Sequence, residues 1–128
     1  MSVFQDSDRE INLIGSTVAW LRNEDAGLQY NIGIVNAWLK DGIALARGCE
    51  LTDGALITHL HADMSAYVEE CKSLRVLIGS LIEQGDSQIS HDAWRDAKSR
   101  CDATDLELVS LSERCDECGV PIIDQHDV

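Results

Sequence analysis

Apolar residues recur at alternating steps of three and four along most of the chain, which is the spacing of one face of a helix. The longest run lies between residues 53 and 84 and repeats as a heptad seam. Thr52 can cap this segment at its start and Gly85 can end it. Its apolar positions are Ile57, Leu60, Met64, Tyr67, Cys71, Leu74, Ile78 and Leu81. The pattern predicts one amphipathic helix over residues 53–84.

A second seam with the same alternation follows a short polar link. Ser90 can cap this segment and Gly119 can end it. The seam contains Trp94, Ala97, Cys101, Thr104, Leu108, Leu111, Cys115 and Cys118. Because long helices joined by a short loop pack antiparallel, residues 53–118 are predicted to form a long antiparallel helical hairpin.

The N-terminal part of the chain predicts two further helices. Ser7 and Glu10 form a capping box, and the stripe Ile11, Ile14, Val18 and Leu21 follows, so a helix is expected over about residues 8–23. Residues 28–47 carry the stripe Leu28, Ile32, Val35, Leu39, Ile43 and Ala46. Asp41-Gly42 between two apolar runs could instead turn a β-hairpin, but the helical stripe favours helix.

Composition supports a single all-α domain. The 128 residues suit one domain, and the 45% hydrophobic content and mean hydropathy of −0.12 favour a folded core over a disordered acidic tail. The only proline is Pro121. We therefore predict a small bundle of about four helices over residues 1–128, with N-terminal helices at 8–47, the hairpin at 53–118 and a tail at 119–128.

The sequence also bounds the cellular setting. No window approaches 18 uninterrupted apolar residues, and the first residues have neither the basic start nor the apolar stretch of a signal peptide. The five cysteines are an odd number at irregular spacing, which favours reduced thiols over a disulfide framework. A cytoplasmic protein that does not bind membranes is expected.

Acidic residues are concentrated after residue 48. Seventeen of the 23 acids lie there against six Lys or Arg, so this part carries −11 of the total charge of −13. A helix over 91–118 carries a net −4 along about 42 Å, whereas duplex DNA carries one charge per about 1.7 Å. The whole domain, about 36 Å across, sets −13 against roughly 21 phosphate charges in the same length of duplex. A basic partner is therefore expected, and not direct binding of nucleic acid.

Binding also needs apolar anchors, because charges at the rim of an interface mainly speed association and select partners. Leu106, Val109, Val76 and Leu77 lie off the seams and are candidate anchors. Most of these residues and of the tryptophans Trp20, Trp38 and Trp94 are nevertheless expected to pack the N-terminal helices onto the hairpin. The predicted partner-binding residues are Glu69, Glu70, Asp92, Asp96, Asp102, Asp105, Leu106 and Val109.

The pair Cys115 and Cys118, followed by glycine, is a candidate zinc site. Over residues 115–122 it resembles the first zinc knuckle of the TraR/DksA family, which implies a zinc-stabilised tail on a regulator that binds RNA polymerase. No second Cys-x-x-Cys pair follows, so Cys101 and His126 would complete the four ligands within one chain, or two chains would share a site. Alternatively, the thiols lie on the helical seam as small apolar groups. This second interpretation is favoured, and no cofactor is expected.

Enzyme motifs are sparse. Glu83-x-x-Asp86, with Glu69 and Glu70 upstream, resembles the carboxylate clusters of all-α nucleotide pyrophosphatases such as the MazG family, which implies magnesium and nucleotide hydrolysis. The sequence has no phosphate-binding glycine loop, nucleophile elbow or zinc-deaminase motif, and no residue is assigned a catalytic role.

The favoured hypothesis is therefore a non-enzymatic acidic inhibitor or regulator. It would bind a basic protein or nucleoprotein complex that handles nucleic acid and occlude its nucleic-acid site. Anti-CRISPR proteins of phage and mobile elements act in this way, which is an analogy of type. A zinc-binding transcription regulator and a metal-dependent nucleotide hydrolase are the alternatives, and the seams could also close between two chains as a homodimer.

Overall fold

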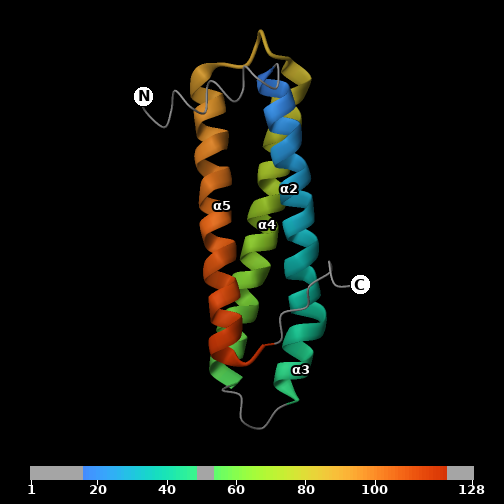
Figure 1. Ribbon diagram of the computed structural model, residues 1–128, viewed down its shortest axis with the longest axis vertical. Helices are drawn as coiled ribbons and strands as arrows, with labels where there is room; N and C mark the ends of the chain where they lie inside the picture. The colour runs from blue at the N-terminus through green and yellow to red at the C-terminus, as the bar shows by residue number, and fades with distance from the viewer. Residues whose placement is uncertain (1–15, 49–53, 121–128) are drawn as a thin grey trace.

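The computed structural model describes residues 16–48 and 54–120, and these residues form a helical bundle without strands (Figure 1). The first long segment joins α2 (Thr17–Ala37), the π-helical turn η1 (Trp38–Gly42) and α3 (Ile43–Arg47) end to end. The second and third are α4 (Gly54–Gln84) and α5 (His91–Cys118). The all-α prediction is confirmed. The expected number of about four helices is wrong for the described residues, which form three long helical segments.

The three segments run lengthwise beside one another. In Figure 1, α2 descends to α3, α4 rises from the lower end, and α5 descends again. Helix α4 packs extensively against both α2 and α5, whereas α2 and α5 contact each other sparsely. The arrangement differs from a hairpin that carries separate N-terminal helices, because α4 is the shared centre of the bundle.

The predicted break between residues 23 and 28 is absent. Val18, Leu21, Leu28 and Val35 are all buried, so the helical stripe continues through the polar segment between them. Within that segment, Asp25 makes an ion pair with Arg75 of α4 at 2.9 Å. Packing on both sides outweighs the weak helix propensity of the residues between, which is the usual source of helix stability in proteins.

Helix α2 begins at Thr17, inside the segment predicted as one helix. Ser16 is extended, with φ of −168°, and its Oγ accepts a hydrogen bond from the Ala19 amide at 2.9 Å. A helix over residues 8–23 is therefore wrong at residue 16, where the chain is not helical. The capping box at Ser7 and Glu10 lies outside the described residues.

Residues 28–47 are helical, as favoured, and Asp41-Gly42 is not a hairpin turn. The two residues lie in η1, where the Ile43 amide donates to the Trp38 carbonyl five residues before it. A π-helical turn adds one residue to a helix. Here Trp38 lies in the core, and its indole Nε1 makes no hydrogen bond within the described part of the chain.

The predicted seams form the core. All eight seam positions of α4 are buried, and on α5 only Leu108 and Cys118 are half-buried. Among residues 16–48 and 54–120, Thr104 is the one residue classed as polar that is buried, and its hydroxyl donates to the Cys101 carbonyl at 2.8 Å. Near the upper end, the Trp20 and Trp94 rings meet edge to face with centroids 5.8 Å apart, which joins α2 to α5. None of the described helices combines the length and apolarity needed to cross a membrane.

The connection between α4 and α5 also fixes the start of α2. Gly85 ends α4 with φ of +83°, a conformation that favours glycine. Ser90 caps α5 through the Ala93 amide, and Gly119 ends it with φ of +73°, as the sequence predicts. In the loop between Gly85 and Ser90, Asp86 Oδ1 accepts a hydrogen bond from the Val18 amide at 2.8 Å. A loop carboxylate thus satisfies one of the open amides at the start of a helix far away in sequence.

Replacing Asp86 with alanine is expected to lower the free energy of unfolding by about 1 kcal/mol, because the Val18 amide loses its acceptor. Asp86→Asn keeps an oxygen acceptor and should lose less. Urea unfolding followed by circular dichroism measures both, with Glu83→Gln, an exposed neighbour, as the control. Equal stability of Asp86→Ala and the control would show that the contact does not hold α2.

Candidate functional site

Two large apolar side chains stand exposed on the outer side of α5. Leu106 is 73% exposed and Val109 is 56% exposed. They lie three residues apart, so they share one face of the helix. Asp102 lies one turn before Leu106 and Glu113 one turn after Val109, and both are exposed, as is Asp105. We call these five residues the acidic α5 face.

Charge is unevenly distributed along α5. From Asp102 to the end of the helix there are six acids and a single base, Arg114. The Arg114 guanidinium is already bound to Asp63 of α4 at 2.6 Å. Asp102 pairs with Lys98 at 3.1 Å, while the other cations of α5 lie nearer its start. The lower half of α5 is therefore strongly negative around the exposed leucine and valine.

Glu24 of α2 adds a further carboxylate to this negative region, near Asp102 and Asp105 of α5. Burial raises the pKa of Glu24, and the charges of Asp105 and Asp102 raise it further against the opposing effects of Cys101 and Lys98. Burial also raises the pKa of Asp105, with Asp102 as the second cause. The three carboxylates repel one another across α2 and α5. A cation placed beside them would relieve that repulsion.

The eight predicted partner-binding residues do not form one patch. Asp102, Asp105, Leu106 and Val109 lie together on the acidic α5 face. Asp92 and Asp96 are exposed on the same helix, but about 21 and 15 Å from Leu106 along its axis. Two further residues belong to α4, where Glu69 pairs with Lys72 at 3.6 Å and Glu70 pairs with Arg100 of α5 at 2.7 Å.

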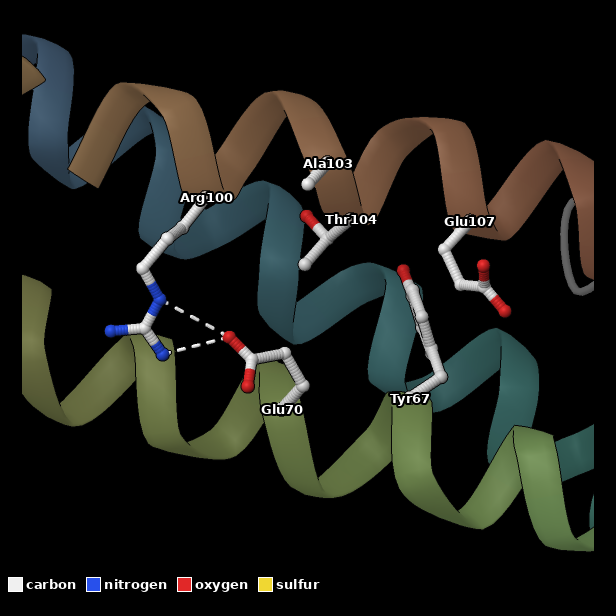
Figure 2. Close-up of a pocket in the computed structure, with 6 residues that line it drawn as sticks. All are labelled: Tyr67, Glu70, Arg100, Ala103, Thr104 and Glu107. Carbon is white, nitrogen blue, oxygen red and sulfur yellow. Dashed lines mark hydrogen bonds and ion pairs between the residues drawn. The ribbon is translucent and has the colours of Figure 1, made fainter. Parts of the chain in front are cut away.

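The structure adds a pocket that the sequence did not indicate. It lies between α4 and α5, has a volume of about 300 Å³, and is shown in Figure 2. Its lining consists of Tyr67, Glu70, Arg100, Ala103, Thr104 and Glu107. A shallower hollow of about 390 Å³ lies around Asp25, Arg75 and Val76 on the other side of α4. Neither could be found from the sequence, because each depends on the register between two helices.

The zinc-knuckle interpretation does not match the described residues. Helix α5 continues through Cys118, and Cys115 is fully buried on the seam. Burial, with a smaller contribution from nearby carboxylates, raises the pKa of Cys115 to about 11 and that of Cys101 to about 12. Protonated, buried thiols are poor metal ligands and nucleophiles. His126 lies outside the described residues, and no group of candidate ligands within them is arranged to hold a metal ion.

The carboxylates of the pyrophosphatase resemblance are also separated. Gly85 ends α4 between Glu83 and Asp86, so the two do not share a helix face. Asp86 is instead bound to the α2 amide of Val18. The described residues therefore do not reproduce the magnesium-binding arrangement that the resemblance implies.

Comparison of the chain with family models, with curated proteins and with solved structures gives no match. The fold alone defines the class of the molecule, an all-α bundle.

Asp105→Asn is expected to raise the melting temperature at pH 7 and to have no such effect below about pH 4. The pKa of this carboxyl is raised in the folded protein, so its ionisation opposes folding. Stability should then fall as pH rises from the ordinary carboxyl pKa through the folded value. Asp96→Asn, an exposed change on the same helix, is the control for the loss of net charge. Calorimetric melting curves that are the same for both variants at every pH would contradict the repulsion.

Alkylation of Cys101 and Cys115 in the folded protein at pH 8 is expected to be at least about 100-fold slower than that of an ordinary exposed thiol. Their thiols are buried and their pKa values are raised to about 12 and 11. Peptide-resolved mass spectrometry after iodoacetamide labelling measures each rate, with the urea-unfolded protein as reference. Rapid labelling of the folded protein, or protection that depends on added zinc, would contradict a packing role.

Proposed function

We propose that the protein is a non-enzymatic interaction module that binds a basic, nucleic-acid-handling protein through the acidic α5 face and covers that protein's nucleic-acid site. The observation that carries the proposal is the exposure of Leu106 and Val109 within a run of carboxylates. Single exposed apolar residues are common on protein surfaces. Two on adjacent positions of one face, ringed by like charge, are the arrangement of an interface with an apolar centre and a charged rim.

The apolar pair and the carboxylates have different roles in this proposal. Burying a leucine or valine side chain contributes roughly 1.5–3 kcal/mol, so Leu106 and Val109 supply affinity. Carboxylates at the rim mainly accelerate association and reject acidic partners. The partner surface that fits is therefore apolar at its centre and rich in Lys or Arg around it.

Charge density favours a basic protein over nucleic acid as the partner. From Asp102 to Glu117, α5 carries a net −5 over about 23 Å, or one charge per roughly 4.6 Å, against about 1.7 Å for duplex DNA. The helix alone reaches about a third of the density of the duplex. Glu24, Asp63, Glu69 and Glu70 add acid on the neighbouring helices. The surface can compete for a site that normally holds phosphates, while the total of −13 repels nucleic acid itself.

The double variant Leu106→Ser, Val109→Ser is expected to lose most partner binding without loss of fold, because both side chains are exposed. Affinity capture from the cells that produce the protein, with duplex and single-stranded nucleic acid as competitors, provides the measurement. Basic nucleic-acid-binding proteins should be retained by the original protein and displaced by the competitors. Val76→Ser is the matched control, since Val76 is 75% exposed on α4, away from α5.

Three results would count against the proposal. Equal capture of the partner by the original protein and the double variant would rule out the acidic α5 face as the docking surface. Capture that nucleic acid does not displace would remove occlusion of a nucleic-acid site. Sedimentation showing that the face instead holds a second copy of the chain would replace the basic partner with a homodimer.

A further inference from the structure

The geometry points to an arginine side chain as the occupant of the pocket between α4 and α5, inserted there by the partner protein. The inference rests on the proposed function, because it names a contact that the partner would make beside the acidic α5 face. Leu106 and Glu107 are consecutive, and Leu106 is one turn from Ala103, so the edge of the pocket meets that face. The pocket itself can be tested without any partner.

The lining divides into apolar walls and charged ends. Figure 2 shows the Glu70–Arg100 pair at one end and Glu107 at the other, with Tyr67 and Thr104 between them. Tyr67 is only 3% exposed, so its ring forms a deep wall and does not reach into solvent. A volume of about 300 Å³ is at the lower end of the range for small-molecule pockets. The space therefore suits a long side chain better than a larger ligand.

The carboxylates of the pocket retain free acceptors. Arg100 Nε and Nη2 both donate to the same Glu70 oxygen, Oε1, at 3.2 and 2.7 Å, and the second oxygen receives no hydrogen bond within the described part of the chain. The Glu107 side chain likewise has no ion pair or hydrogen bond to any described residue. With one cation against two carboxylates, the lining has a net charge of −1. A second cation in the pocket would balance it.

A guanidinium fits these features better than an ammonium. Its planar fork carries five N–H donors, so one group can bind carboxylates on two sides, and its flat face packs on aromatic rings. Lysine presents a compact, strongly hydrated charge with no preferred plane. The methylene stem of arginine can lie along the walls formed by Ala103, Thr104 and Tyr67 while its head stays near Glu70 and Glu107.

The test is an NMR titration of the full chain with N-acetyl-arginine-N-methylamide, compared with the citrulline and lysine analogues. The arginine compound should produce saturable shifts at the Ala103 and Thr104 methyl groups and the Tyr67 ring, with a dissociation constant in the millimolar range. Citrulline, which has the same shape without the charge, should give none, and lysine should bind at least about threefold more weakly. Glu107→Gln should lower the affinity for the arginine compound by at least about threefold, whereas Glu83→Gln, an exposed change outside both the pocket and the acidic α5 face, should leave it unchanged.

Chemical-shift changes with the citrulline or lysine compound equal to those with the arginine compound would overturn the guanidinium site. Shifts that do not saturate and that spread over all acidic residues would also overturn it. So would an unchanged affinity of Glu107→Gln for the arginine compound. Failure here is distinguishable from failure of the proposed function. The titration contains no partner and leaves Leu106 and Val109 intact. If the arginine compound does not bind but the protein still captures a partner through these residues, only the arginine site is ruled out. If the arginine compound binds but the double variant Leu106→Ser, Val109→Ser captures the partner as well as the original protein does, only the docking face is ruled out.

Discussion

The structure depends on the burial of one apolar seam, that of α4, against two neighbouring helices at once. Leu60, Met64, Leu74 and Ile78 are fully buried. Because α2 and α5 contact each other little, each is held in the bundle mainly by its contact with α4. This arrangement leaves no room for unpaired charge inside, since an isolated buried carboxylate is strongly unfavourable. Most of the excess acid must lie on outer faces or at helix edges, and where it is partly covered, as at Glu24, the pKa of the carboxyl rises.

The same constraint assigns the two sides of α5. Its inner side is occupied by Trp94, Cys101 and Cys115, so these cysteines act as small apolar groups with protonated thiols. Its outer side carries Leu106 and Val109 among carboxylates, and nothing in the described part of the bundle covers them. The interaction proposed for the protein therefore uses a surface that the core does not need.

Features that depend on local spacing were predictable, and those that depend on how helices meet were not. The seams of α4 and α5 and their stops at Gly85 and Gly119 follow from periodicity and glycine conformation. The exposure of Leu106 and Val109 follows from their position off the seam. The unbroken helix through residues 23–28 could not be predicted from local spacing, because packing on α4 overrides the weak helix propensity of these residues. The same holds for the pocket, where Glu70 and Arg100 are 30 residues apart, and for Asp86, which binds an amide 68 residues away.

Hydroxyl-radical footprinting of the protein, alone and bound to the partner that it captures, would show whether the partner docks on the acidic α5 face. Oxidation of Leu106 and Val109 is expected to fall severalfold in the complex, while that of Val76, which is also exposed in the free protein, should stay unchanged. Protection of Val76 with unchanged oxidation of Leu106 and Val109 would show that the partner binds another surface, and the role assigned to the acidic α5 face would be wrong.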